Sequence, residues 1–429
     1  MGKLLIRQAH ILDPASGRDE IGDLLISDGK IEAIGQQIAE DAEQIIDAQG
    51  LCAAPGLVDI HVHFRDPGLT YKEDILTGAA AAAAGGFTSV VCMANTKPVA
   101  DSTETIAYIC RKAEEAPIAV YPAAAVTKGF GGKELTDFPA LLEAGAVGFT
   151  DDGIPLQDAG ILREAMKKAY ELQVPISLHE EDPAMIERPG VNQGKVSEEL
   201  QYGGAPSISE YSMVERDCAI ALETGAKLDI QHISAKESVE IVRRAKAAGA
   251  DVHGEVTPQH FSANEELVLA KGCLARVNPP LRTEEDRLAL IEGLKDGTLD
   301  LIATDHAPHS REEKAKDIKD APSGMIGLET ALALGITSLV EPGHLSLMEL
   351  LRKMTVNPAK LYQLDAGELR VGGPADLVLF DEKQKWTVTD NFASKANNSP
   401  FIGWELSGKV RYTICGGKVV FSGNRSKQV

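Results

Sequence analysis

Two histidines separated by one residue, His61 and His63, are the first residues in the chain whose types and spacing could do chemistry. They belong to an apolar run that begins at Leu57 and ends in an Asp-Pro-Gly turn. Residues two apart in a strand point to the same side, so both imidazoles can face one point. Neutral imidazoles that converge at a strand end are ligands for Zn²⁺ or another late transition ion. The alternative is two unrelated histidines, one solvated and one hydrogen-bonded in a core.

Further polar residues follow other apolar runs that we predict to be buried strands. They are Asn95, Asp151, Asp152, His179, His232 and Asp305. The carboxyl ends of parallel barrel strands meet on one face, so four histidines and two or three carboxylates would meet in one mouth. This number of nitrogen and oxygen ligands exceeds one tetrahedral site. It suits two divalent ions bridged by a carboxylate and a hydroxide.

The elements that must position these side chains are predicted from apolar runs that alternate with amphipathic stretches. The predicted strands are Leu57–His63, Thr88–Ala94, Ile118–Ala124, Ala146–Thr150, Val174–His179, Lys227–Ile233, Asp251–Val256 and Leu299–Thr304. The predicted helices include Ser102–Ala116, Ala159–Leu172, Ser209–Thr224, Ala235–Ala248 and Glu284–Lys295. Eight strands, each followed by a helix or a long loop, predict an α/β fold of the (β/α)8 barrel type. An open doubly wound sheet is the runner-up, but it would carry a glycine-rich phosphate turn that this sequence lacks.

Short strands and turns return at both ends of the chain. Strands are predicted at Leu4–Ile6, Asp23–Ile26, Lys30–Ile34, Gln44–Asp47, Ala375–Phe380, Trp386–Val388, Lys409–Cys415 and Lys418–Phe421. Asp28-Gly29 between two of them is a strong hairpin signal. Each terminal segment is too small for its own core, so the two most simply pair into one composite β domain. The predicted domains are residues 1–55 plus 366–429 for this β domain and 56–365 for the barrel.

The composition narrows the possible partners and the compartment. Across 429 residues, 43 Lys and Arg stand against 64 Asp and Glu, a formal charge of −21. Such a surface repels nucleic-acid backbones and anionic lipid, so neither partner is expected. The six cysteines show no close pairing and are expected to be reduced thiols in the cytoplasm. The N-terminus turns polar too early for a signal peptide, and no apolar run is long enough to span a membrane.

Four motifs together resemble the dihydroorotase family, within the class I branch of the amidohydrolase superfamily. They are Asp59-Ile-His-Val-His-Phe-Arg-Asp-Pro-Gly68, Met93-Ala-Asn-Thr-Lys-Pro98, Phe149-Thr-Asp-Asp-Gly153 and Ala303-Thr-Asp-His-Ala-Pro-His309. The resemblance covers essentially the whole chain. It implies a metal-dependent (β/α)8 barrel with a β domain from both termini. It also implies interconversion of N-carbamoyl-L-aspartate and L-dihydroorotate in pyrimidine biosynthesis.

The resemblance assigns a metal-binding role to the histidines and to carboxylates among these strand-end residues. His61 and His63 would hold the first of two zinc ions with Asp305 beside it, and His179 and His232 would hold the second. Many superfamily members bridge their ions with a carboxylated lysine after the fourth strand. Here that position reads Asp151-Asp152, and class I enzymes similarly bridge with an aspartate. Alignment with that branch selects Asp152, with Asp151 as the alternative. Adjacent strand residues point to opposite faces, so only one of the two can face the mouth if the strand is regular.

The resemblance also assigns a substrate pocket. The substrate is anionic, and the Arg65 guanidinium, two residues beyond His63, can bind a carboxylate bidentately. The other pocket residues implied are Asn95, Asn278, His309, Ser323 and Gly324. The loop 317–321 that leads into Pro322 is similar to the segment that closes over the ring. Gln259 stands where the family often has a histidine. Neither Gln259 nor the adjacent His260 is expected to be a ligand. His10, His253 and His344 are expected to be structural or solvated.

The same residues imply a mechanism and help to weigh the rival functions. In hydrolysis, Asp305 would act as general base toward the nucleophile and then as general acid toward the leaving nitrogen. Dihydropyrimidinases, hydantoinases and allantoinases are the rival enzymes, but they usually carry the lysine bridge and need no arginine after the paired histidines. A non-catalytic relative that scaffolds a transcarbamoylase would lose metal ligands, whereas every ligand position is filled here. A homodimer and association with an aspartate transcarbamoylase stay open, because interfaces cannot be read from one sequence.

Overall fold

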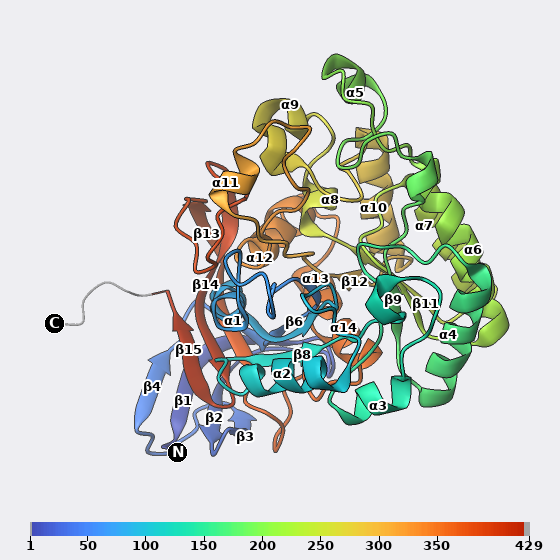
Figure 1. The fold of residues 1–429 in the computed structure, drawn as a ribbon. Helices are drawn as coiled ribbons and strands as arrows, with labels where there is room; N and C mark the ends of the chain where they lie inside the picture. Colours follow the sequence, from blue (N-terminus) through green and yellow to red (C-terminus); the bar gives the residue numbers. More distant parts are fainter. Residues whose placement is uncertain (1, 424–429) are drawn as a thin grey trace.

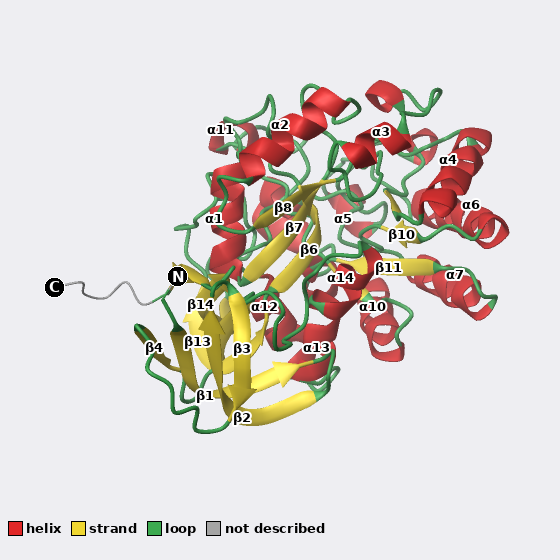
Figure 2. Ribbon diagram, turned by 90° about the horizontal axis from the view of Figure 1, so that it is seen from below, coloured by secondary structure: helices red, strands yellow, loops and turns green. Residues whose placement is uncertain are grey.

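The computed structural model describes residues 2–423, in which a β sheet built from both ends of the chain lies beside a larger α/β region (Figure 1). Residues 1 and 424–429, which fall within the predicted composite β domain, lie outside the described residues. In Figure 2 the long strands of the terminal sheet gather on one side, and most helices surround the shorter strands on the other. None of the helices between residues 2 and 423 is long and apolar enough to span a membrane.

The terminal sheet has eight strands in the order β15-β14-β13-β5-β1-β2-β3, with β4 paired to β1. Its strands are β1 (Leu4–Asp13), β2 (Arg18–Ser27), β3 (Lys30–Gly35), β4 (Gln44–Asp47), β5 (Cys52–Pro55), β13 (Leu377–Thr387), β14 (Glu405–Cys415) and β15 (Lys418–Ser422). The two ends of the chain join where β5 pairs antiparallel with β13. The hairpin at Asp28 and Gly29 is confirmed, because both have positive φ, 50° and 76°, as a type I′ turn requires.

Two sheets of parallel strands form the centre of the α/β region. One has the order β6-β7-β8 and the other β12-β11-β10-β9. Their strands are β6 (Leu57–Val62), β7 (Phe87–Cys92), β8 (Ala119–Pro122), β9 (Ile176–Leu178), β10 (Leu228–Ile230), β11 (Val252–Val256) and β12 (Leu301–Ile302). Seven of the eight predicted inner strands are therefore present, each at the predicted place but shorter.

The one predicted inner strand that is missing from this set, residues 146–150, is reduced to isolated bridges. Phe149 bridges in parallel to Ala124 and to Ile176, and so connects the end of β8 with β9. Backbone bonds continue on both sides, but Pro122 and Pro175 serve only as acceptors there. Because proline has no N–H to donate, the ladder breaks up and no continuous strand forms.

The other edges of the two parallel sheets also meet. Val62, at the end of β6, bridges in parallel to His306, four residues after β12. The His63 N–H donates to the His306 carbonyl at 2.9 Å. The Thr304 N–H donates to the buried Asp59 carboxylate at 3.2 Å. The two parallel sheets are therefore linked at both outer edges, and their carboxyl ends face the same way.

Helices connect and cover the parallel strands. The longer ones are α1 (Ile75–Gly85), α2 (Thr103–Ala113), α4 (Ala159–Leu172), α6 (Ile208–Thr224), α7 (Lys236–Ala247), α10 (Glu284–Asp296) and α13 (Leu347–Met354). Shorter ones are α3 (Phe138–Glu143), α5 (Lys195–Glu199), α8 (Pro258–Ser262), α9 (Leu267–Lys271), α11 (Arg311–Lys314), α12 (Ala331–Gly335) and α14 (Val356–Leu361). The five predicted helices are confirmed, with ends within three residues of the prediction. Asp74, Ser102, Asp158 and Thr283 cap the N-termini of α1, α2, α4 and α10 by accepting backbone N–H bonds.

A partly exposed ion cluster lies at the amino ends of the parallel strands. His253 on β11 places Nδ1 2.7 Å from Asp300 and Nε2 3.3 Å from Asp251. Burial opposes protonation, but the two carboxylates prevail and raise the pKa of His253 to about 9. This histidine is structural, as the sequence analysis expected.

We expect His253 to make stability depend on pH. Its folded pKa lies above the unfolded value of about 6.5, so its contribution is complete below that pH and is lost as pH rises through about 9. His253→Gln should therefore lower the free energy of unfolding more at pH 6 than at pH 9.5, measured by urea denaturation. His344→Gln is the control and should show no such trend. A constant difference across the pH range would contradict the prediction.

Candidate active site

Six residues predicted from the strand ends meet at the carboxyl face of the parallel strands. Each is at most 8% exposed. They are His61, His63, Asp152, His179, His232 and Asp305. They come from β6, from the loops that follow β9, β10 and β12, and from the segment after the Phe149 bridges. The structure thus brings together side chains that lie up to 244 positions apart in the sequence (305 minus 61).

The first cluster is formed by His61 and His63 with two carboxylates. The Nε2 atoms of the two rings lie 3.4 Å and 3.5 Å from the two oxygens of Asp152. Asp305 Oδ1 lies 2.9 Å from His63 Nε2 and 3.6 Å from His61 Nε2. The alternation of a strand places both rings on one side, as predicted.

The second cluster is formed by His179 and His232. His179 Nδ1 and His232 Nε2 face each other at 2.9 Å, and each lies 3.8 Å from Asp152 Oδ1. His61, His63 and Asp152 form one group able to hold a metal ion, and Asp152, His179 and His232 form another. Asp152 belongs to both groups and lies between the two histidine pairs.

Asp151 has a different position from Asp152. Its carboxylate accepts the N–H of Val126 at 2.8 Å and the N–H of Thr127 at 3.1 Å, and also the Thr127 hydroxyl. These bonds hold the loop after β8 in place. The geometry therefore places Asp152, rather than Asp151, between the two histidine pairs.

Three partners orient the histidine rings toward the centre of the site. Glu255 Oε1 lies 2.9 Å from His61 Nδ1, Asn95 Oδ1 lies 2.9 Å from His63 Nδ1, and Glu181 Oε2 lies 3.0 Å from His179 Nε2. In each ring the other nitrogen remains directed at the cluster, which is the usual arrangement around metal-binding histidines. Glu255 also accepts the His232 N–H at 3.0 Å.

Sequence reasoning missed the two orienting glutamates. Glu255 is fully buried in the apolar strand β11, and a charged residue in such a strand was the available signal. Glu181 lies two residues beyond His179 in a polar segment that carries no comparable signal. Asn95, which is predicted to bind substrate, has both ends of its amide in contact with clustered residues, because Oδ1 faces His63 and Nδ2 donates to Asp152 at 3.2 Å.

Three residues of the site have a left-handed backbone. The φ values are 60° for Arg65, 35° for His232 and 49° for Asp305. Residues other than glycine pay a conformational cost in this region, of order 1–3 kcal/mol each, and such strain gathers at functional sites. Each lies where the chain turns sharply at the end of a strand, which aims the side chain into the mouth.

The electrostatics match a cation site. Burial disfavours the charged form of Asp152, but His61, His63 and His179 outweigh it and hold the pKa of that carboxyl well below its usual range. Burial, together with His179 and His61, lowers the pKa of His232 well below its ordinary value. His232 is therefore neutral, the form in which imidazole binds metals.

The side chains fit a metal ion. His61 Nε2 is buried and has no hydrogen-bond partner among residues 2–423. His179 Nδ1 and His232 Nε2 face each other, and each could instead donate its lone pair to a cation beside them. Imidazole nitrogens with carboxylate oxygens are the donor set of Zn²⁺ and similar divalent ions. The cluster can therefore hold a metal ion.

Arg65 lies beside this cluster, as predicted. Its Nε donates to the Pro308 carbonyl at 3.4 Å. Burial lowers the pKa of Arg65, and the nearby carboxylates of Asp305 and Asp152 oppose that shift. Among the described residues only the Nε of this partly buried guanidinium is hydrogen-bonded, so its terminal nitrogens can receive a carboxylate.

The predicted residues His309, Ser323 and Gly324 contact one another. His309 Nε2 lies 2.8 Å from the Ser323 carbonyl, so Nε2 carries the proton, and Nδ1 accepts from Lys72 at 3.2 Å. Burial and the nearby cations, Arg65 foremost, lower the pKa of His309 to about 2, so the ring is neutral. Gly324 has φ 126°, and a Cβ there would lie 3.0 Å from His309 Nε2. Only glycine fits this contact without strain.

Asn278, the loop 317–321 and His260, which the sequence analysis also singled out, have clear positions in the structure. Asn278 Oδ1 is buried and lacks a hydrogen-bond partner among the described residues, so it is available to a ligand N–H. The loop 317–321 is held by Arg276, whose guanidinium donates to the Ile318 and Ala321 carbonyls. Both ring nitrogens of His260, which is not expected to be a ligand, contact other groups, the Thr257 hydroxyl and the Pro279 carbonyl.

Comparison with known proteins gives one family. A family model described as dihydro-orotase-like matches residues 50–238, and one described as the amidohydrolase family matches residues 322–421. The dihydroorotase of Clostridioides difficile (strain 630) is 56% identical over 98% of this chain and 100% of its own length. The dihydroorotase of Lactococcus lactis subsp. lactis (strain IL1403) is 55% identical over 97% of this chain and 99% of its own length.

Solved structures of related enzymes share the fold. L-hydantoinase (dihydropyrimidinase) from Arthrobacter aurescens superposes with a TM-score of 0.87 at 26% identity, over 98% of this chain and 96% of that one. Dihydropyrimidinase from Brevibacillus agri NCHU1002 superposes with a TM-score of 0.85 at 24% identity, over 98% and 95%. The fold is thus that of the amidohydrolases, whereas the high sequence identity points to one branch of them. This chain belongs to the dihydroorotase family and is a cyclic amide hydrolase.

Proposed function

We propose that this enzyme interconverts L-dihydroorotate and N-carbamoyl-L-aspartate, the ring-closing step of de novo pyrimidine biosynthesis. The observation that carries the proposal is the 55–56% identity, over nearly the whole chain, to relatives named dihydroorotase. The Arg65 guanidinium beside the metal-binding cluster agrees with it, because the substrate is an anion in both directions.

We further infer that the two parallel sheets and the Phe149 bridges form a single (β/α)8 barrel. The parallel links at both outer edges of the sheets support closure. Residues 56–365 would be the barrel, and residues 1–55 plus 366–429 the composite β domain. In such a barrel the carboxyl ends of the strands carry the active site, and the clustered histidines lie there.

Two zinc ions are proposed as the cofactor. His61 and His63 would hold one, with Asp305 beside it, and His179 and His232 the other, with Asp152 shared between them. When bound, divalent ions of this kind polarise a carbonyl and lower the pKa of water.

The protein residues would carry the substrate and the proton. Arg65, His309 and Asn278 would bind the substrate carboxylate and ring, with the 322–324 loop against them. In hydrolysis, water adds to the ring amide carbonyl carbon and Asp305 takes its proton. The ring C–N bond then breaks, and Asp305 returns the proton to the leaving nitrogen. Ring closure is the reverse sequence and releases one water.

A dihydropyrimidinase or hydantoinase is the rival function, because solved structures of those enzymes share the fold. They are only 24–26% identical to this chain. Their substrates lack a ring carboxylate, so they have no use for a guanidinium placed as that of Arg65 is. Direct comparison of L-dihydroorotate and dihydrouracil hydrolysis by the zinc-loaded enzyme separates the two. Preference for dihydrouracil would overturn the proposal.

Replacement of Arg65 tests substrate choice most directly. Arg65→Met should reduce kcat/KM for dihydroorotate by about 30-fold to 4,000-fold, because loss of one partner of a desolvated charge pair costs roughly 2–5 kcal/mol. Steady-state hydrolysis assays measure the effect, and metal analysis should show unchanged content. Arg311→Met, which removes an exposed charge from α11, is the control. Normal activity of Arg65→Met would remove this residue from the substrate site.

A further inference from the structure

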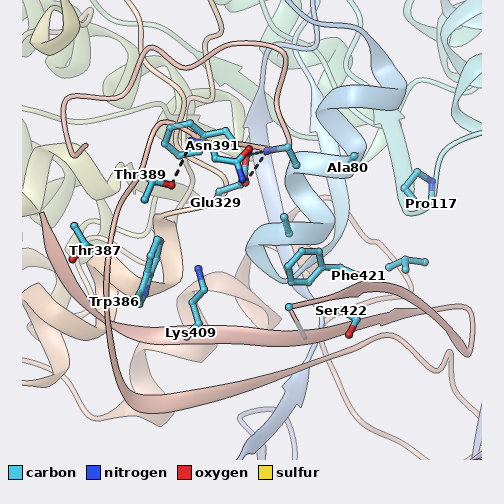
Figure 3. Close-up of a pocket in the computed structure, with 15 residues that line it drawn as sticks. Ala80, Pro117, Glu329, Trp386, Thr387, Thr389, Asn391, Lys409, Phe421 and Ser422 are labelled. Carbon is cyan, nitrogen blue, oxygen red and sulfur yellow. Dashed lines mark hydrogen bonds between the residues drawn. The ribbon is translucent and has the colours of Figure 1, made fainter. Parts of the chain in front are cut away.

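The connection between β13 and β14, residues 388–404, leaves the terminal sheet and runs onto the loops of the active site. Its first part borders a cavity of about 1270 Å³, between the terminal sheet and α1. Figure 3 shows Asn391 of this connection next to Glu329 on the cavity wall, with Trp386 and Lys409 of β13 and β14 below. The Glu329 carboxylate accepts the N–H of Ala393 at 3.0 Å and of Ser394 at 3.2 Å. These bonds fix the direction in which the connection leaves the cavity.

The next residues bind the loop that follows β6. Glu73, which is fully buried, accepts the Ser394 hydroxyl and, at 3.3 Å, the Lys395 N–H. Lys395 Nζ donates to the Thr70 carbonyl at 2.9 Å. This loop contains Arg65, so the connection is tied to the segment that presents the guanidinium.

Asn398 then joins two further loops of the site. Its Oδ1 accepts the His309 N–H at 3.2 Å, and its Nδ2 donates to the Ala307 and Gly324 carbonyls, each at 3.1 Å. Its own carbonyl accepts the Ile326 N–H at 3.2 Å. The residue is 2% exposed. Both of its amide hydrogens and its acceptor are used, so its orientation is fully determined.

These bonds connect Asn398 with the substrate side of the pocket. The loop after β12 carries His309, and the loop that contains Ser323 and Gly324 packs against it. The contact between His309 Nε2 and the Ser323 carbonyl depends on the separation of these two loops, and Asn398 spans that separation. None of its bonds reaches the histidines of the metal-binding cluster.

We propose that Asn398 is a positioning residue, through which the β13–β14 connection sets the distance between His309 and Gly324 for substrate binding. The inference rests on the proposed function. Because the metal-binding cluster is untouched, loss of Asn398 should weaken substrate binding and leave the chemical step largely intact. Buried hydrogen bonds left without one partner are costly, so the loops must shift when Asn398 is removed.

Asn398→Asp is the sharpest test, because it keeps the shape and the acceptor but replaces two donated hydrogens by a carboxylate oxygen that faces two carbonyls. Asn398→Ala removes all three side-chain bonds. Asn397→Ala is the matched control, since Asn397 is adjacent and its side chain has no hydrogen bond to the described residues in the structure.

The enzyme is loaded with zinc, and kcat and KM for dihydroorotate hydrolysis are measured together with metal content and thermal unfolding. We expect KM to rise at least about tenfold in both Asn398 variants, with kcat changed less than about threefold and metal content unchanged. Asn397→Ala should resemble the wild type. A normal KM in Asn398→Asp, or a loss of thermal stability alone, would overturn the proposal.

Hydrogen–deuterium exchange provides a readout that needs no substrate. Residues 307–311 and 322–327 should exchange faster in Asn398→Asp than in the wild type, with the strands unchanged. Unchanged exchange in those loops would overturn the positioning role. Failure of the wild-type enzyme to hydrolyse dihydroorotate would overturn the proposed function instead, and the exchange experiment would still decide whether Asn398 braces the loops.

Discussion

Asp152→Ala is expected to abolish metal binding at both sites together. Asp152 lies between two histidine pairs, within 3.4–3.8 Å of a nitrogen from each pair. Its loss removes a shared ligand and the negative charge that offsets two dications. After dialysis against buffer with micromolar zinc, elemental analysis should find less than about one tenth of the wild-type metal, and dihydroorotate hydrolysis should fall to background.

Asp151→Asn is the matched control for that experiment. An asparagine oxygen can still accept the Val126 and Thr127 N–H bonds that Asp151 accepts, so metal content should stay close to wild type. The reverse order, with metal lost from Asp151→Asn and retained in Asp152→Ala, would move the bridge to Asp151.

Metal removal by chelator and zinc restoration without CO₂ should return full activity, because an aspartate bridge needs no carboxylation. A bicarbonate requirement would indicate a carboxylated lysine.

Asp305→Asn is expected to reduce kcat by at least about two orders of magnitude. Asp305 lies 2.9 Å from His63 Nε2 and is 8% exposed, the largest exposure among the six clustered residues. It therefore lies both beside the proposed ions and within reach of a substrate. An asparagine can still accept a hydrogen bond but cannot take and return a proton. Steady-state and single-turnover hydrolysis of dihydroorotate measure the loss.

Metal content and substrate binding separate the proton role of Asp305 from a ligand role. Asp305→Asn should retain most of its zinc, because the histidine pairs and Asp152 remain, and its affinity for dihydroorotate should change far less than kcat. Asp41→Asn, an exposed replacement just before β4, should be neutral. Near-wild-type turnover by metal-loaded Asp305→Asn would exclude Asp305 as the proton carrier.

Local periodicity was enough to predict much of this protein. The alternation of side chains along a strand put His61 and His63 on one side. Apolar runs predicted the positions of seven inner strands. Terminal β segments, each without a core of its own, had to pair, and β5 pairs with β13. Helices with caps and amphipathic patterns ended close to the predicted residues. These features depend on contacts within a few residues, or on the burial of one face, and both are visible in a sequence.

Only the tertiary structure decided which polar groups meet. His61 is oriented by Glu255, 194 positions away, and His309 is held by Asn398, 89 positions away. The choice between Asp151 and Asp152 depended on which of them the loop after β8 engages. Asn95 contacts His63 and Asp152, a pairing that no spacing in the sequence indicated. A hydrogen bond between distant segments depends on how whole strands and loops pack, and no local pattern of residues encodes that distance.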